Sequence, residues 1–312
     1  MRNMTVITEI LLLGIPSLQQ YKFLTFSLFL VIYCVTIWGN LLIISLVAQS
    51  KNLHSPMYFF LTQLSLCDIL VATDIAPNML YVVFNDGGLI SLLGCITQYL
   101  IFCTSGGSEC LHLTVMSYDR YLAICNPLHY NAIMSHMFCF KLILMCWVLS
   151  FLVLLSQAIP TFKLWFCGPH VIDHFFCDFF PLIELSCSDT YAFEIETKLS
   201  SVTIVIMPFL IIIISYSYII SAVLKMPSLT GRHKAFSTCS SHLVVVSIYY
   251  GTMTSTYSVP TKENSQSLSK LLSLLYTVVT PIINPIIYSF RNKDIHKAID
   301  IFIKNISVSK SR

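Results

Sequence analysis

Long stretches without a charged side chain constrain this sequence more than any other feature. Asp, Glu, Lys and Arg are absent from five blocks, residues 23–50, 142–162, 199–224, 235–261 and 271–290. A helix needs about 20 apolar residues to cross a bilayer, and each block reaches that length. Only 11% of all residues are charged, against about 25% in soluble domains. The blocks therefore predict membrane-spanning helices, and a soluble bundle with buried helices is the less favoured alternative.

Two further segments, 57–84 and 92–124, are mostly apolar but carry isolated acids. With them, the sequence predicts an all-α membrane protein, a bundle of seven transmembrane helices over residues 23–290. Residues 1–22 then form the N-terminus and residues 291–312 the tail. The expected spans lie at about 23–49, 57–84, 92–126, 139–160, 197–225, 234–259 and 268–290.

Basic residues set the expected orientation of the bundle. Twelve of the 18 Lys and Arg side chains fall on one side of the membrane and six on the other. The richer side is cytoplasmic by the positive-inside rule, so the N-terminus is extracellular and Asn3 is a glycosylation acceptor there. The net charge of +3 is mostly this cytoplasmic excess and indicates no nucleic-acid partner. The apolar stretch 10–16 follows Glu9 instead of a basic cluster, so we expect no cleaved signal peptide.

The long connection between spans four and five, about residues 161–198, is acidic and extracellular in this orientation. It holds Cys167, Cys177 and Cys187, and Cys95 opens span three on the same side. Extracellular cysteines favour disulfides. His170 and His174 with Cys177 also have the spacing of metal ligands, but a disulfide on Cys177 would remove its thiolate and leave the set incomplete.

Beyond span seven, one helical face of the tail carries the apolar residues Ile295, Ile299, Phe302 and Ile303. Charged residues fall largely on the other faces. This pattern predicts an amphipathic helix that lies on the lipids of the inner leaflet, with a disordered tail as the alternative.

Asp119 and Arg120 stand side by side at the cytoplasmic end of span three. Ionised groups at that depth usually pair, line a water-filled cavity or serve a function, although Arg120 taken alone can also be an ordinary basic residue at the inner boundary. Span seven ends on the motif NPIIY, where Pro285 interrupts the helix and Asn284 offers hydrogen bonds. Asp68 adds a polar group inside span two.

Five stretches carry a family resemblance in a fixed order along the chain. They are LHSPMYFFL (53–61), MSYDRYLAICNPLHY (116–130), SYSYI (215–219), KAFSTCSSHL (234–243) and PIINPIIYSFRNKD (281–294). Together with seven spans, they resemble the rhodopsin-like G-protein-coupled receptors and, within them, the odorant receptors. Ser117 and Leu122 replace the Ala and Val that are commoner in the family.

The resemblance implies that Asp119 restrains Arg120 at rest, in the triplet completed by Tyr121. A ligand-driven outward swing of span six then frees Arg120 to meet a G protein. Tyr216 and Tyr288 are expected to stabilise the open form. The switch set is Asp119, Arg120, Tyr121, Tyr216, Asn284, Pro285 and Tyr288. The resemblance also implies the disulfides Cys95–Cys177 and Cys167–Cys187.

The expected ligand is a small volatile or weakly polar molecule. Amine receptors of the superfamily carry an Asp where this chain has Phe102, and opsins need a Lys that 271–290 lacks. Family resemblance places the pocket on spans three, five and six. The expected pocket residues are Phe102, Cys103, Gly106, Gly107, Cys110, Ser200, Ile204, Tyr250, Met253, Thr254 and Tyr257. Core packing is the alternative for each of them, and the two glycines fit close helix packing equally well.

Asp68 and Glu109 are acids inside otherwise apolar spans. The position of Asp68 resembles the sodium site of the superfamily, and we expect the pair to hold Na⁺ near Asn284 in the resting state. A proton shared between the two carboxylates is the alternative. We expect no other cofactor.

These features predict an odorant receptor in the plasma membrane of olfactory sensory neuron cilia. It is expected to activate a stimulatory, olfactory-type G protein and to raise cAMP. A rhodopsin-like receptor for another lipid or peptide ligand is the main alternative. A transporter is expected to show paired half-helices or repeats, and an enzyme is the least favoured class, since no nucleophile–base set appears in the sequence.

Overall fold

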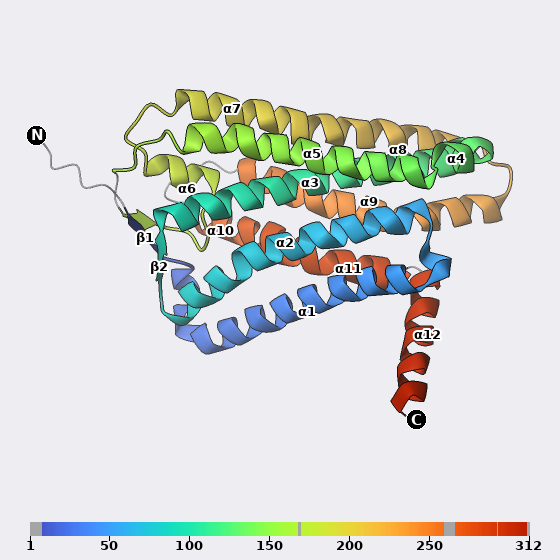
Figure 1. Cartoon of the computed structure of the whole chain (residues 1–312), viewed down its shortest axis with the longest axis horizontal. Helices are drawn as coiled ribbons and strands as arrows, with labels where there is room; N and C mark the ends of the chain where they lie inside the picture. The colour runs from blue at the N-terminus through green and yellow to red at the C-terminus, as the bar shows by residue number, and fades with distance from the viewer. Residues whose placement is uncertain (1–7, 168–169, 259–265, 292, 311–312) are drawn as a thin grey trace, which may run out of the picture.

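The computed structural model describes residues 8–167, 170–258, 266–291 and 293–310. Long helices lie side by side and give an elongated bundle (Figure 1). The bundle is built from α1 (Lys22–Gln49), α2 (Pro56–Phe84), α3 (Leu92–Cys125), α5 (His136–Thr161), α7 (Tyr191–Ser201), α8 (Met207–Lys225), α9 (Leu229–Ser258), α10 (Gln266–Leu274) and α11 (Thr280–Arg291). Short π-helical segments, η3 (Val202–Ile206) and η5 (Leu275–Val279), join α7 to α8 and α10 to α11.

Five helical stretches among the described residues are long and apolar enough to span a membrane. They are Gln19–Gln49, Pro56–Phe84, His136–Thr161, Tyr191–Lys225 and Ser267–Tyr288. The more polar α3 is a central helix, and it buries Glu109, Asp119 and Arg120. Since protein surrounds these charges on several sides, α3 does not need the apolar composition that lipid contact imposes.

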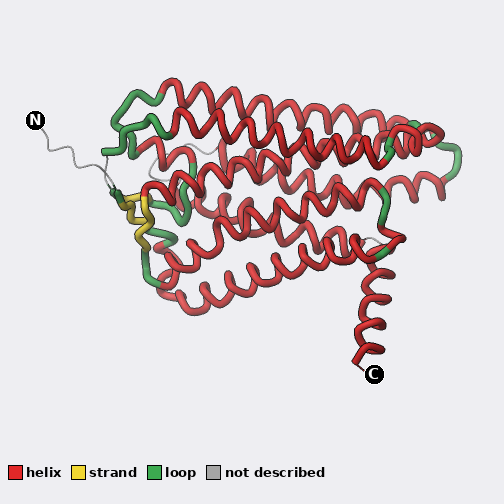
Figure 2. Tube along the Cα trace, viewed as in Figure 1, coloured by secondary structure: helices red, strands yellow, loops and turns green. Residues whose placement is uncertain are grey.

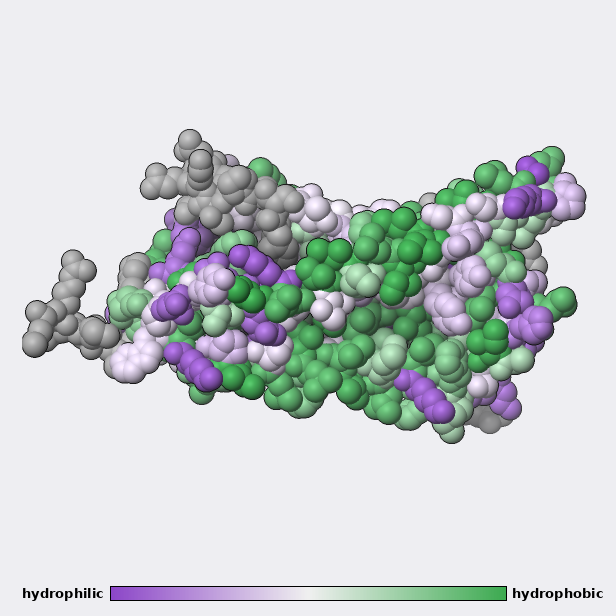
Figure 3. All heavy atoms as spheres, turned by 90° about the horizontal axis from the view of Figure 1, so that it is seen from above, coloured by the Kyte–Doolittle hydropathy of each residue, from purple (hydrophilic) through white to green (hydrophobic). Residues whose placement is uncertain are grey.

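The outer face of the bundle is apolar around its middle, and hydrophilic residues gather toward both ends (Figure 3). Large apolar side chains are exposed on the outer helices, including Trp38 at 67% on α1 and Phe151 at 56% on α5. In water such a surface would drive association, whereas in a bilayer it contacts acyl chains. The surface thus agrees with the membrane class expected from the charge-free blocks.

A small sheet covers the end of the bundle that the sequence predicts to be extracellular, on the side away from the C-terminal helix (Figure 2). Strand β1 (Glu9–Leu12) lies between β2 (Gly88–Ser91), to which it is antiparallel, and β3 (Val171–Ile172), to which it is parallel. Leu12 faces Gly88 in the first pairing and Ile172 in the second. Pairing with β1 thus brings three distant chain segments together. We call this sheet, together with the loop around β3, the extracellular cap.

Two disulfides tie the cap to the bundle. Cys95 at the start of α3 is bonded to Cys177, with the Cα atoms 5.4 Å apart. Cys167 is bonded to Cys187 and closes the base of a loop that contains β3 and the short helix α6 (Phe179–Glu184). Both pairings implied by the resemblance are therefore present. Ile10 and Leu12 of β1 are fully buried in a second core beneath the cap, which includes Tyr99 and Phe193.

The opposite end, which the sequence predicts to be cytoplasmic and which we call the cytoplasmic end, carries η2 (Lys51–Leu53), α4 (Pro127–Ile133) and α12 (Lys293–Lys310). In Figure 1, α12 runs across the bundle axis instead of along it. Ile295 and Ala298 are buried against the bundle, whereas Lys297 and Asp300 are exposed. The tail is therefore helical and amphipathic, and the alternative of a disordered tail is wrong for its described part.

Two helices begin five or six residues before the expected spans. α7 starts at Tyr191 and α9 at Leu229, whereas the sequence placed the spans from 197 and 234. A helix satisfies its own backbone hydrogen bonds, so it can continue into water past the membrane boundary. The limits of the membrane segments themselves stay predictions.

Candidate functional site

At the cytoplasmic end, Asp119 is held between two partners. Its Oδ2 accepts a hydrogen bond of 2.9 Å from Arg120 Nε and a further one from the terminal nitrogen Nη2. Its Oδ1 accepts from the Tyr130 hydroxyl at 2.7 Å. Burial, followed by the charge of Asp119, raises the pKa of Tyr130, so the hydroxyl keeps its proton and donates. Both carboxylate oxygens are occupied, and Arg120 is only 8% exposed.

His242 on α9 links three helices beside this ion pair. Its Nδ1 lies 2.7 Å from the Tyr216 hydroxyl of α8, and its Nε2 lies 3.1 Å from the Leu113 carbonyl of α3. Since a carbonyl only accepts, Nε2 carries the proton and Nδ1 accepts from Tyr216. Sequence reasoning missed His242, although it lies in the KAFSTCSSHL stretch that carried the resemblance.

Among the described residues, the tyrosines of the predicted switch form no hydrogen bond with Arg120, whose bonds go to Asp119. Tyr288 is fully buried, and its hydroxyl has no hydrogen-bond partner among the described residues. Tyr121 packs against Tyr118 and Tyr218, with ring centroids 6.4 and 6.0 Å away. In this structure Tyr216 is hydrogen-bonded to His242. The predicted role of Tyr216 and Tyr288 belongs to the open form of the receptor, which is a different conformation and stays a prediction.

Asn284 connects α11 to α2. Its Nδ2 donates to both carboxylate oxygens of Asp68, at 2.9 and 3.1 Å. Pro285 packs so closely on Gly39 of α1 that an added Cβ there would lie 3.3 Å from the Pro285 Cβ. Asn40 of α1 donates to the Pro281 carbonyl at 3.2 Å. The NPIIY motif therefore holds α1, α2 and α11 together.

The two intramembrane acids offer the oxygens that a sodium ion needs. Asp68 and Glu109 are 0% and 2% exposed. Glu109 Oε1 and Asn40 Oδ1 are buried without a hydrogen-bond partner in the described part of the chain. Hard cations bind carboxylate and amide oxygens, so both unsatisfied atoms are of the type that a sodium ion binds. Asp68 and Glu109 would hold it, and Asn284 is already bonded to one of them.

Near the centre of the bundle, several expected pocket residues gather around two tyrosines. The Tyr249 hydroxyl donates to the Gly106 carbonyl at 2.7 Å and lies 3.3 Å from the Tyr276 hydroxyl. Cys110 Sγ donates to Tyr249 at 3.4 Å. The Phe102 ring contacts Tyr276, with centroids 5.6 Å apart. We call Phe102, Gly106, Cys110, Tyr249 and Tyr276 the central cluster.

Sequence reasoning missed Tyr249 and Tyr276 for different reasons. The sequence pattern favoured Tyr250, on the face shared with Tyr257, whereas the neighbouring Tyr249 forms the hydrogen bonds to α3. Tyr276 lies in the π-helical segment η5, where the wider turn shifts the face on which a residue lies. No short motif marks either residue.

The two glycines of α3 are sites of close packing. A Cβ on Gly106 would lie 2.5 Å from the Tyr276 hydroxyl, and one on Gly107 would lie 2.8 Å from Cγ2 of Ile204. Both contacts require the absence of a side chain. The packing alternative thus holds for both glycines, and Gly106 additionally belongs to the central cluster.

The remaining expected pocket residues differ in their burial and in their distance from the central cluster. Tyr250 is buried and stacks on Phe209 at 4.6 Å, and its hydroxyl has no partner among the described residues. Met253 is buried and Cys103 is half-buried, whereas Thr254 is exposed. Ser200 accepts from Gln157 of α5 at 3.0 Å, outside the central cluster. The side chain of Tyr257 lies outside the described residues, as does Asn3.

The extracellular cap reaches down to the central cluster. Phe176, next to the disulfide, contacts Phe102 with ring centroids 5.2 Å apart. His174 packs on Phe176 at 4.8 Å, and Cys177 has no free thiolate. Of the three residues in the metal interpretation, His170 is exposed and Cys177 is oxidised, so the set does not form a metal site.

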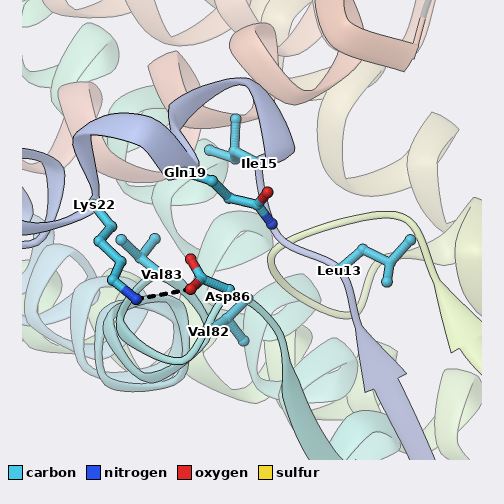
Figure 4. Close-up of a pocket in the computed structure, with 7 residues that line it drawn as sticks. All are labelled: Leu13, Ile15, Gln19, Lys22, Val82, Val83 and Asp86. Carbon is cyan, nitrogen blue, oxygen red and sulfur yellow. Dashed lines mark hydrogen bonds and ion pairs between the residues drawn. The ribbon is translucent and has the colours of Figure 1, made fainter.

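A small pocket at the edge of the cap is separate from the central cluster. It lies where α1 begins and α2 ends, beside the ion pair between Lys22 Nζ and Asp86 Oδ2 at 2.7 Å (Figure 4). Its lining residues are Leu13, Ile15, Gln19, Lys22, Val82, Val83 and Asp86. None of them belongs to the predicted ligand site.

Comparison with known proteins decides the family. A family model described as olfactory receptor matches residues 29–305. Olfactory receptor 5A2 of Homo sapiens is 45% identical over 297 residues, which cover 95% of this chain and 92% of the relative. This chain belongs to the olfactory receptor family. Olfactory receptor 1496 of Rattus norvegicus is 44% identical over 299 residues, with 96% of each chain covered.

The fold of this olfactory receptor is similar to that of squid rhodopsin. The crystal structure of that protein matches with a TM-score of 0.73 and 18% identity, covering 90% of this chain and 85% of the other. The predicted seven-helix fold and membership in the odorant receptors are therefore confirmed. This olfactory receptor is a multi-pass membrane protein and a non-enzymatic receptor.

Proposed function

We propose that this olfactory receptor binds a small volatile or weakly polar odorant at the central cluster and activates a stimulatory, olfactory-type G protein, which raises cAMP. The arrangement of α9 supports this proposal most directly. On one helix, Tyr249 contacts the central cluster and His242, two turns away, bonds to α8 and α3 beside the ion pair. A ligand that displaces Tyr249 therefore acts on the helix that closes over Arg120.

In this proposal, the closed arrangement keeps basal signalling low. Arg120 is covered, and Asp119 uses both oxygens to hold Arg120 and Tyr130. An outward swing of α9 breaks the hydrogen bonds of His242 to Tyr216 and to the Leu113 carbonyl. Arg120 is then uncovered toward the cytoplasm, where a G protein binds.

We place the receptor in the plasma membrane of sensory cilia with the N-terminus outside and with a glycan on Asn3. The basic excess of the opposite side supports this orientation. Two disulfides in the cap support it as well, because they form in an oxidising compartment.

A cAMP reporter in cells that express the full chain tests this function against a panel of volatile compounds. We expect concentration-dependent responses to some of them and none in mock-transfected cells. Responses to a peptide or to a long-chain lipid, with silence toward every volatile, would favour the alternative receptor class.

Sodium bound by Asp68 and Glu109 stabilises the resting state in this proposal. Basal cAMP is then expected to fall as sodium rises, with choline chloride keeping the ionic strength constant. Glu109→Ala removes one ligand and should abolish that dependence. Identical sodium titrations of both proteins at equal surface expression would favour the shared proton.

A further inference from the structure

The extracellular cap holds a buried cation above the central cluster. Lys270 lies on α10, and its side chain is 7% exposed. Its Nζ donates to Asp173 Oδ1 at 2.5 Å, the one hydrogen bond of this ammonium group within the described residues. An ammonium group has three donors, so two remain for another acceptor. A buried cation with spare donors is costly unless something uses them.

The two members of this pair differ in their surroundings. The Asp173 side chain is 35% exposed, five times more than that of Lys270. Asp173 can therefore turn into water at little cost, whereas Lys270 cannot follow it. A second anion that reaches Lys270 from inside can take the place of Asp173 without leaving either charge buried and unpaired.

His174 does not compete for this role. Burial, and next the charge of Lys270, lower the pKa of His174 to about 3. The imidazole is therefore neutral at physiological pH and carries no charge for an anion. Lys270 is left as the positive group of this part of the cap.

The inward face of α10 and η5 leads from Lys270 to the central cluster. Lys270, Ser273 and Thr277 follow the spacing of one helical face, and all three are buried. Tyr276 lies six residues beyond Lys270, which is about 9 Å along a helix axis. The ring contacts from His174 through Phe176 to Phe102 follow the same direction from the loop side. A molecule with one polar end and an apolar chain of that length suits this path.

We propose that Lys270 is the anion-binding end of the odorant site and that this receptor recognises small aliphatic carboxylic acids. The carboxylate of the ligand replaces Asp173 on the ammonium group, and its chain lies along Ser273 toward Phe102. This inference rests on the proposed function, and it names the chemical class of the ligand.

Two opposite substitutions test the exchange. The probes are straight-chain acids from butanoic to decanoic acid and the alcohols of equal length, with cAMP and surface expression measured together. Lys270→Met should raise the EC50 for acids about 10- to 100-fold, the loss of one charge-assisted hydrogen bond. Asp173→Asn should lower the EC50 for acids, because the competing carboxylate is gone. Neither should change the response to alcohols.

A purely structural clasp predicts another outcome. Both substitutions break the same ion pair, so acid and alcohol responses would then shift together and in the same direction, which would overturn the proposal. Lys270→Arg keeps the charge and should retain the acid response. If Lys270→Met does not reach the surface, Asp173→Asn decides alone, since an unchanged or higher EC50 for acids contradicts the exchange.

The outcome for the wild type separates this inference from the proposed function. Responses to other volatiles without a response to any acid would overturn the ligand class and leave the odorant receptor intact. Silence toward every volatile, with the receptor present on the surface, would contradict both.

Discussion

The two ends of the bundle hold an ion pair in different ways. Asp119 and Arg120 are sequence neighbours on one helix and are both buried. Lys270 and Asp173 are 97 residues apart, and only the lysine is buried. Removing a partner from a fully buried pair leaves a charge without compensation. We therefore expect helix motion to release the cytoplasmic pair, and we propose that a small anion can replace one member of the extracellular pair.

This difference matches the roles that we assign to the two ends. The cytoplasmic end must stay closed until a conformational change occurs, and it uses short-range contacts on α3 with His242 as the link. The extracellular end must admit a ligand, and it uses a cap made of distant segments. Disulfides and a sheet hold the cap, so that a single exchangeable contact at Lys270 does not dismantle it.

The largest effect is expected at the cytoplasmic end. Arg120→Ala should abolish odorant-stimulated cAMP while the receptor still reaches the surface, because Arg120 is the group presented to the G protein. Asp119→Asn serves as the matched variant, and it should raise basal cAMP by freeing Arg120. Undiminished signalling in Arg120→Ala would contradict the role of Arg120 as the switch residue at the cytoplasmic end.

The disulfides should rank by the length of chain that they close. Cys95–Cys177 closes a separation of 82 residues and Cys167–Cys187 one of 20. In the chain-entropy model, replacing both cysteines of a pair by Ser costs about 4.5 kcal/mol for the first and about 3 kcal/mol for the second. Thermal unfolding of the purified receptor in detergent checks the order. A larger loss from the shorter loop would contradict it.

Acid should weaken the extracellular cap through His174. Its pKa in the folded chain is about 3, below the value of about 6.5 for an unfolded chain. Stability is then complete above pH 6.5 and falls as the pH drops below that value, because the unfolded chain takes up the proton first. Between pH 7.5 and pH 5 the loss is about 2 kcal/mol.

The melting temperature over this pH range, measured for wild type and His174→Phe, checks the acid effect. The variant keeps the ring contacts with Phe175 and Phe176 and should lose most of the pH dependence. Lys270 and Asp173 are the charged groups beside His174, and both remain in the variant. Equal slopes for the two proteins would show that the acid effect arises elsewhere.

The smallest effect is expected from Tyr130. Tyr130→Phe removes one hydrogen bond to Asp119, worth about 1 kcal/mol, and leaves Arg120 as the partner of the carboxylate. Basal cAMP should rise by a few-fold, less than in Asp119→Asn. A basal level equal to that of the wild type would mean that Tyr130 does not help to hold the closed state.

The contrast between neighbouring and distant partners also explains which features could be predicted from the sequence. Charge-free blocks predict the helices because lipid contact imposes a composition that is visible in a short window. Asp119–Arg120 is visible because the partners are adjacent. The strand Glu9–Leu12 was read only as a short apolar stretch, since its partners in β2 and β3 lie far along the chain.

Lys270 was hidden for a similar reason. In the sequence it is one basic residue at the outer boundary of span seven, and only the folded loop brings Asp173 to it. Tyr276 was hidden by the π-helical turn of η5, which changes the face that a residue presents. Long-range contacts that no family motif marks thus escaped sequence reasoning, whereas contacts within one helix and those implied by the resemblance, such as the two disulfides, did not.

The central claim is that ligand binding at the extracellular half opens α9 at the cytoplasmic end. Leu128 on α4 and His233 on α9 are both exposed there, and genetically encoded spin labels at these two positions can report their separation in nanodiscs. We expect the distance to lengthen when the most potent odorant of the cAMP screen is added, and to return when it is washed out. A distance that stays the same with and without a saturating odorant would contradict the account.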